Sequence, residues 1–127
     1  MLSLSELVQK EGLQADVLGS LEVASLTSDS RSVMPGALFV AMPGTTRDGA
    51  CYIPEAVKAG AVAVLAAHDA VLDSCPVPVL RASDMRAAVG RVAALFYPHQ
   101  PQWNMAITGT DGKTSTAEFV RQIAQHC

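Results

Sequence analysis

Residues 28–65 read SDSRSVMPGALFVAMPGTTRDGACYIPEAVKAGAVAVL, and this stretch decides the fold class. It holds two short apolar runs of strand length, 37–41 and 61–65, and glycine or proline punctuation precedes each. Between them, 52–60 predicts a helix with a proline in its first turn and a glycine as its stop. Apolar runs without polar alternation are typical of strands buried in a parallel sheet. The stretch therefore predicts an α/β fold.

The alternation of helix and strand extends toward the N-terminus. Ser3 and Glu6 have the spacing of a capping box, and leucines and valines follow at helical intervals, so a short helix is expected there. Residues 21–26 then predict a strand that leads into the polar turn 27–31. A polar turn directly after a strand is a candidate binding segment.

The pattern also continues toward the C-terminus. Residues 77–80 predict another buried strand, and Ser83 is expected to cap a helix that ends before the prolines of segment 98–101. Two prolines flanking polar residues are typical of a linker. We therefore expect one domain over 1–98 and the start of a second over 99–127.

The composition indicates a globular protein. Half of the 127 residues are apolar and 17% are charged, which is enough apolar surface for one core. The net charge of -3 provides no basic field for counterion release, so nucleic acid is not an expected partner. We expect a monomer.

The cysteines and the apolar segments bear on the compartment. Cys51, Cys75 and Cys127 lack metal-ligand spacing and are odd in number, which predicts reduced thiols, with the first two packed as small apolar side chains. The N-terminus has no secretory signal, and the longest apolar stretch is far below the roughly 18 residues of a membrane span. A cytoplasmic protein without membrane association is expected.

A second chemical motif lies near the end of the chain. An apolar run at 103–108 predicts a strand, 109–113 a glycine-punctuated loop, and 114–125 a helix. This arrangement presents unpaired backbone N–H groups and the positive end of a helix dipole to a phosphate chain. The candidate ATP-binding residues are Gly109, Thr110, Asp111, Gly112, Lys113, Thr114 and Ser115.

Two side chains of this loop have specific expected roles. Lys113 would place its ammonium group on the β and γ phosphates, and the Thr114 hydroxyl would ligate Mg²⁺. The sequence therefore implies ATP and Mg²⁺ as cofactors. The loop is shorter than the common GxxxxGK[ST] form, which would need glycine where Ile107 stands. A solvated surface turn, the alternative, does not explain the threonines and serine around the glycines.

ITGTDGKTST at 107–116 resembles the ATP loop of the Mur ligases, TGTNGKTT, from which Asp111 departs. The DSR turn, PGxLFVA strand, DG loop and YI-x-x-A helix of 28–65 occur in the same order in the Mur ligases that add the third amino acid. The resemblance covers essentially the whole chain. It implies a small N-terminal domain with a mixed sheet and flanking helices, followed by the first βα unit of a P-loop-type central domain.

The resemblance also implies a substrate site. In this family the first domain holds the UDP end of the precursor. The positions that match its contacts to uridine and diphosphate are Ser28, Ser30, Thr45, Thr46 and Arg47. Taken without the resemblance, the serines are polar turn residues and Arg47 is a surface ion-pair partner of Asp48. Arg31 is expected to be a structural partner of Asp29, not a ligand.

The implied reaction is ligation of an amino acid to UDP-MurNAc-L-Ala-D-Glu. The γ-phosphoryl group of ATP would pass to the glutamate carboxylate, and the amine of diaminopimelate, lysine or ornithine would displace phosphate from the acyl phosphate. The family's magnesium-binding glutamate and histidine, carbamylated lysine and third domain would follow residue 127. We therefore expect no catalytic residue in this chain and no ligation by it alone.

Two other functions remain open at this point. One is the Mur ligase that adds D-alanyl-D-alanine, although its ATP loop more often reads GSxGKT. The other is a non-catalytic module that binds a UDP-sugar or a nucleotide. Binding of UDP ligands and of Mg-ATP would distinguish them.

Overall fold

The computed structural model describes residues 2–11, 13–15, 21–44, 48–72, 74–99 and 101–126. Its elements are β1 (Leu2–Ser3), α1 (Leu4–Glu11), β2 (Gln14–Ala15), β3 (Glu22–Val23), β4 (Ser25–Thr27), η1 (Ser30–Ser32), β5 (Ala37–Ala41), η2 (Gly49–Tyr52), α2 (Ile53–Lys58), β6 (Ala61–Ala67), β7 (Val79–Ala82), α3 (Met85–Phe96) and α4 (Lys113–His126), where η marks a 3-10 helix.

The centre of the fold is a five-stranded sheet in the order β2-β7-β6-β5-β4. The strands from β4 to β7 are parallel, and β2 joins the edge antiparallel to β7. β1 and β3 form a separate antiparallel pair. The α/β class with a mixed sheet and flanking helices is confirmed. The carboxyl ends of the four parallel strands lie along one edge, which is where α/β sheets usually bind ligands.

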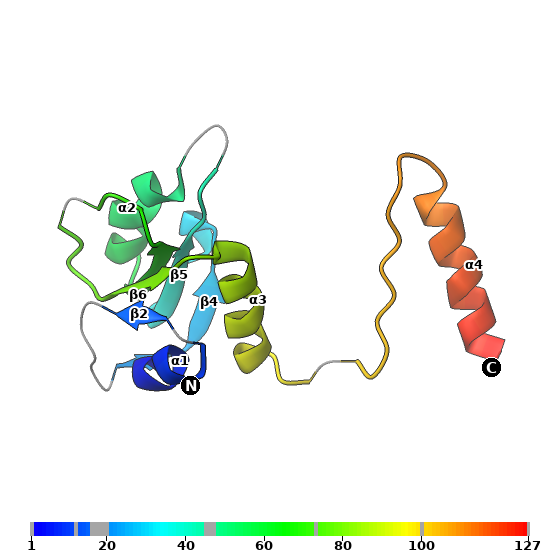
Figure 1. The fold of residues 1–127 in the computed structure, drawn as a ribbon, viewed down its shortest axis with the longest axis horizontal. Helices are drawn as coiled ribbons and strands as arrows, with labels where there is room; N and C mark the ends of the chain where they lie inside the picture. The colour runs from blue at the N-terminus through cyan, green and yellow to red at the C-terminus, as the bar shows by residue number, and fades with distance from the viewer. Residues whose placement is uncertain are drawn as a thin grey trace.

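Helices cover both faces of this sheet, and Figure 1 shows α2 and α3 on opposite sides of it. The cluster beneath α1 and α3 includes Leu4, Leu7, Leu38, Leu65, Leu80 and Val92. The cluster beneath α2 includes Phe39, Ile53, Ala56, Val64 and Val79. Successive residues of β5 point alternately to the two clusters, so every residue of this strand is buried. This explains why its sequence is apolar throughout.

The strands and helices follow the sequence pattern with small shifts. The run at 37–41 is β5, 61–65 lies within the longer β6, and 77–80 overlaps β7. The predicted strand at 21–26 is split in two. Its first part, β3, pairs with β1, whereas β4 pairs with β5, and the Ala24 N–H between them donates to the Gly36 carbonyl at 2.8 Å. The segment forms two strands because its two parts pair with two different sheets.

Side chains cap α1 and α3. At α1, the Ser3 N–H donates to Glu6 Oε2 at 3.1 Å and the Glu6 N–H to Ser3 Oγ at 3.2 Å, which confirms the capping box. At α3, the predicted cap Ser83 is wrong. The next residue, Asp84, has extended backbone angles and accepts a hydrogen bond from the Ala87 N–H at 3.0 Å. Serine and aspartate both cap helices, so the sequence alone does not show which of the two residues precedes the first helical residue.

Removal of the α3 cap gives a direct test of this assignment. We expect Asp84→Ala to lower the free energy of unfolding by about 1 kcal/mol, because the N–H of Ala87 loses its acceptor. Urea unfolding followed by circular dichroism measures the change. Ser83→Ala serves as the matched control and should stay within about 0.5 kcal/mol of the parent. A larger loss for Ser83→Ala than for Asp84→Ala would contradict the assignment.

Residues 101–126 form an extended segment followed by α4, which Figure 1 shows apart from the sheet. The predicted helix at 114–125 is confirmed, whereas the predicted strand at 103–108 is wrong, because none of the strands in the described residues pairs with it. Its large apolar side chains are exposed, Trp103 at 89% and Met105 at 71%. In the described part of the chain, no helix has both the length and the apolar character to span a bilayer.

Candidate functional site

A hollow of about 390 Å³ opens where β4 ends. Its lining residues are Ser28, Asp29, Ser30, Arg31, Tyr52 and Glu55. The first four belong to the polar turn and to η1, and the last two to η2 and α2. The hollow therefore lies at the carboxyl edge of the parallel strands, with the two candidate serines on its wall.

Asp29 and Arg31, which both line the hollow, form an ion pair. Arg31 Nε and Nη2 donate to the two carboxylate oxygens of Asp29 at 2.9 and 2.8 Å, and the Arg31 N–H donates to Asp29 Oδ1 at 3.0 Å. These hydrogen bonds and the positive charge of Arg31 lower the pKa of Asp29 to about 2. The prediction that Arg31 is a structural partner of Asp29 is confirmed.

The titration of Asp29 provides a test of this pair. Because the folded-state pKa is lowered from 3.8 to about 2, the pairing is fully present above pH 3.8 and is lost as the pH falls through 2. We expect an NMR titration of the Asp29 carboxyl carbon to show a midpoint near 2. Arg31→Gln should return it toward 3.8.

Glu118 is an internal control in the same spectra. Its pKa is also lowered to about 2, by hydrogen bonds from Arg121 and Gln122 on α4. Arg31→Gln should leave the Glu118 midpoint unchanged. An Asp29 midpoint that does not move in Arg31→Gln would contradict the assigned cause.

Ser30 links the turn to α2. Its Oγ donates to Glu55 Oε2 at 3.0 Å, across 25 positions of sequence. Ser28 and Tyr52 also line the hollow, and Ser28 is exposed whereas Tyr52 is half-buried. Tyr52 and Glu55 were not predicted as site residues, although both lie in the YI-x-x-A segment of the sequence.

The candidate residues Thr45, Thr46 and Arg47 lie outside the described residues. The segment on either side of them is described. The Gly49 N–H donates to the Met42 carbonyl at 2.9 Å, and the Asp48 carboxylate caps η2 by accepting from the Ala50 N–H at 3.1 Å. The chain therefore leaves β5 and returns to η2 at the same edge of the sheet as the hollow.

The candidate phosphate loop precedes α4. Gly109 and Gly112 have φ values of +147° and +72°, which favour glycine, and no atom lies within 4 Å of a Cβ placed on Gly112. The Lys113 ammonium donates to the carbonyls of Gly109 and Thr110. The first N–H groups of an α-helix have no partner within the helix. The open loop, the ammonium and these N–H groups together fit a phosphate group.

The remaining candidates of this loop are also accessible. Thr110, Asp111, Thr114 and Ser115 are exposed, and Thr114 stands in the first turn of α4, where a hydroxyl could reach a cation bound to phosphate. The structure brings Ser28 and Ser30 together in one hollow. It does not bring the phosphate loop to that hollow, as Figure 1 shows.

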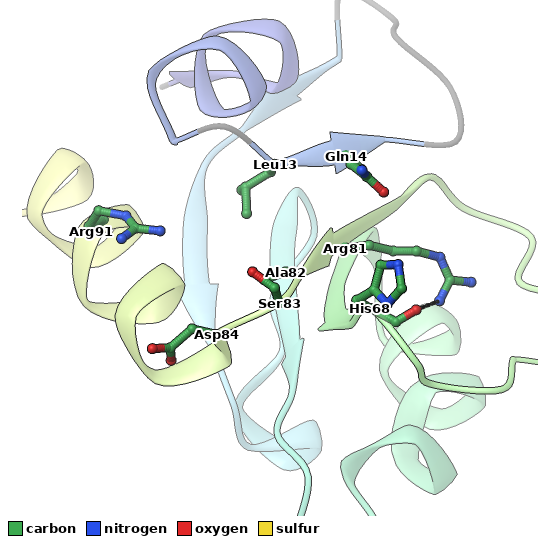
Figure 2. A pocket seen from close by; sticks show the side chains of 8 residues that line it. All are labelled: Leu13, Gln14, His68, Arg81, Ala82, Ser83, Asp84 and Arg91. Atoms are coloured by element: carbon green, nitrogen blue, oxygen red, sulfur yellow. Dashed lines mark hydrogen bonds between the residues drawn. The ribbon is translucent and has the colours of Figure 1, made fainter.

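A smaller hollow of about 110 Å³ lies at the end of β7 (Figure 2). Arg81 and Arg91 both line it, but they come from opposite sides in Figure 2. Arg81 Nη1 donates to the carbonyls of His68 and Ala70 at 3.3 and 3.0 Å, so the arginine holds the turn after β6. We interpret this hollow as structural.

The two described cysteines differ in environment. Both are free thiols, as the sequence predicts. Cys75 is partly buried against the cluster beneath α2, which confirms its predicted packing. The same prediction is wrong for Cys51, because η2 leaves this side chain exposed on the surface.

A family model described as the Mur ligase family, catalytic domain, matches residues 22–97. The chain belongs to this family. The matched residues include the whole sheet apart from β2, and all the residues that line the hollow at the end of β4. The family resemblance seen in the sequence is thereby confirmed.

Curated Mur ligases are similar over most of this chain. The UDP-N-acetylmuramoyl-L-alanyl-D-glutamate--2,6-diaminopimelate ligase of Agrobacterium fabrum is 48% identical over 114 residues, 90% of this chain and 22% of that protein. The protein of the same name from Gloeobacter violaceus is 34% identical over 98% of this chain and 26% of its own length. This chain spans about a quarter of the length of such relatives.

Solved Mur ligase structures share the fold. The UDP-N-acetylmuramoylalanyl-D-glutamyl-2,6-diaminopimelate--D-alanyl-D-alanyl ligase of Acinetobacter baumannii matches with a TM-score of 0.69 and 24% identity, over 98% of this chain and 28% of that chain. The MurF ligase of Thermotoga maritima, solved in complex with ADP, matches with a TM-score of 0.59 and 24% identity, over 86% of this chain and 25% of its own.

Proposed function

We propose that this chain supplies the first part of a cytoplasmic, ATP-dependent ligase that adds the third amino acid to UDP-MurNAc-L-Ala-D-Glu in peptidoglycan synthesis. Residues 1–98 would form the domain that holds the UDP end of the precursor, and 99–127 the start of the ATP-binding domain. The observation that carries the proposal is the hollow at the carboxyl end of β4, which lies within the family match. The relatives' names favour diaminopimelate as the added amino acid.

The charges of the hollow favour the nucleoside over the diphosphate. Its wall carries two carboxylates, Asp29 and Glu55, and the arginine that lines it among the described residues, Arg31, is already paired with Asp29. Negative charge there repels phosphate, whereas uracil and ribose are neutral. In this proposal Ser28 and Ser30 contact the uridine. Thr45, Thr46 and Arg47 would hold the diphosphate, because an arginine and two hydroxyls suit phosphate oxygens.

The phosphate loop would hold ATP. Bound ATP supplies the phosphoryl group that activates the glutamate carboxylate of the precursor. In this chain the first N–H groups of α4 would donate to phosphate oxygens, and Lys113 would turn from its present carbonyl acceptors to the phosphates. Thr114 would contribute its hydroxyl to the Mg²⁺ that accompanies ATP. These residues bind and position, and we assign no catalytic residue to the chain.

Calorimetric titration of the 127-residue chain tests the proposal. We expect UDP-MurNAc-L-Ala-D-Glu to bind, and Ser30→Ala to weaken binding by roughly tenfold, since one hydrogen bond is lost. Ser83→Ala, a serine outside the hollow, is the control and should bind as the parent does. Absence of binding by the parent chain would contradict the proposal.

A second titration and an assay separate the two parts of the proposal. Binding of the UDP precursor without binding of Mg-ATP would show that residues 1–98 bind their ligand in this chain and that the phosphate loop does not. Incubation with ATP, precursor and diaminopimelate should give no amide product. Product formed by this chain alone would contradict our expectation that the catalytic residues are absent from it.

A further inference from the structure

Glu55 fixes the direction in which the Ser30 hydroxyl can form hydrogen bonds. The two side chains meet at 3.0 Å on the wall of the hollow, and one comes from η1 and the other from α2. A carboxylate accepts hydrogen bonds but has no proton to donate, so the serine hydroxyl is the donor. Its single proton is committed to Glu55. What Ser30 offers a ligand is therefore an acceptor, the lone pairs of Oγ.

The other charged groups of the hollow are the Asp29–Arg31 ion pair and Glu55 itself. The Asp29 carboxylate and the Arg31 guanidinium are directed at each other through two hydrogen bonds. Glu55 accepts from Ser30 through Oε2, and its Oε1 is a further acceptor. Around Ser30 and Glu55 the hollow thus presents acceptors. It fits a ligand group that donates.

Uridine and its close analogues differ in such donors. Uracil carries a donor at N3–H and ribose carries two hydroxyl donors, whereas cytosine has an acceptor at N3 and a deoxyribose lacks one hydroxyl. An acceptor placed against the Ser30 oxygen would face a second acceptor and leave both without a hydrogen bond, which costs binding free energy. A site built to pair one polar group therefore discriminates strongly against the analogue without it.

We propose that Glu55 is a positioning residue that holds the Ser30 hydroxyl as an acceptor and thereby makes the hollow select a nucleoside that donates a hydrogen bond at this point. The donor is the N3–H of uracil or a ribose hydroxyl. The inference rests on the proposed function, because it assigns the hollow to the uridine of a UDP ligand. It adds a source of specificity that lies outside the polar turn.

Titration of the 127-residue chain with UDP, CDP, 2′-deoxy-UDP and 3′-deoxy-UDP tests the inference. We expect the parent to prefer UDP over at least one analogue by roughly tenfold. Glu55→Ala should reduce that preference to about twofold, since the freed hydroxyl can then rotate and donate. The analogue whose disadvantage disappears identifies the donor as belonging to the base or to the ribose.

A double-mutant cycle distinguishes positioning from a structural role. If Glu55 acts through Ser30, then adding Glu55→Ala to the Ser30→Ala variant should not change the ratio of the UDP affinity to the analogue affinity. Glu55→Gln should restore part of the preference, because the carboxamide oxygen still accepts from Ser30. A merely structural role would weaken all four ligands equally. Glu22→Ala, an exposed glutamate of β3, is the matched control.

The outcomes separate this inference from the proposed function. If the parent binds UDP without preference, or if its preference survives Glu55→Ala, the positioning role is excluded while UDP binding stands. If neither UDP nor the UDP-precursor binds the parent, the proposed function fails and the inference fails with it.

Discussion

Phe39→Ala is expected to lower the free energy of unfolding by about 3–5 kcal/mol, because it removes an aromatic ring from the core. Phe39 is 1% exposed and belongs to β5, which lies between β4 and β6. Its ring packs in the cluster beneath α2, where Ile53 and Val64 are also buried. A loss of this size is a large fraction of the stability of a small domain. Urea unfolding monitored by circular dichroism gives the value.

The chain contains a matched control for this change. Phe119 lies on α4 and is 66% exposed, so Phe119→Ala removes the same atoms from a site that is open to solvent. We expect it to change the unfolding free energy by no more than about 0.5 kcal/mol. Equal losses in the two variants would show that the core does not lie where the structure places it.

Sequence patterns predicted the elements whose own residues determine them. β5 and β6 are apolar runs bounded by turn residues, and α1 carries a capping box whose two hydrogen bonds join residues three positions apart. Such local signals need no knowledge of the rest of the fold. The α/β class followed from the order of these elements.

The errors arose where a partner decides the structure. Residues 21–26 form two strands because β1 and β5 each pair with one part, and neither pairing is visible in the segment itself. The apolar run at 103–108 has the composition of a strand, but no strand of the described part of the chain pairs with it. Hydrophobic pattern predicts the capacity to form a strand, and pairing decides whether one forms.

The candidate site divides in the same way. The pairing of Arg31 with Asp29 is local and was predicted from the DSR turn, whereas the bond from Ser30 to Glu55 joins residues 25 positions apart. The packing of α2 against η1 creates that bond and the hollow itself. The proposed roles of Ser28 and Ser30 remain predictions, as do those of the phosphate loop.

Gly49→Ala is expected both to destabilise the fold and to weaken binding of the UDP precursor. A Cβ on Gly49 would lie 2.6 Å from the Met42 carbonyl oxygen, 2.7 Å from the Met42 nitrogen and 2.9 Å from the Ala41 carbonyl carbon. All three are backbone atoms, and Ala41 is buried at the end of β5, so a rotamer change cannot relieve the overlap. We expect a loss of about 3 kcal/mol in unfolding free energy, as in other overpacked sites.

The effect on binding is expected because the displaced backbone is joined to residues 45–47. Met42 and Gly49 lie on either side of residues 45–47, which we propose to hold the diphosphate, and their hydrogen bond fixes the two ends of that segment. Calorimetry should therefore show weaker binding of the UDP precursor at a temperature where the variant is still folded. Gly90→Ala on α3 is the control: no atom lies within 4 Å of its Cβ, and it should stabilise the fold by about 0.4–1 kcal/mol and leave binding unchanged. Unaltered binding of the UDP precursor by folded Gly49→Ala would contradict the proposed role of residues 45–47.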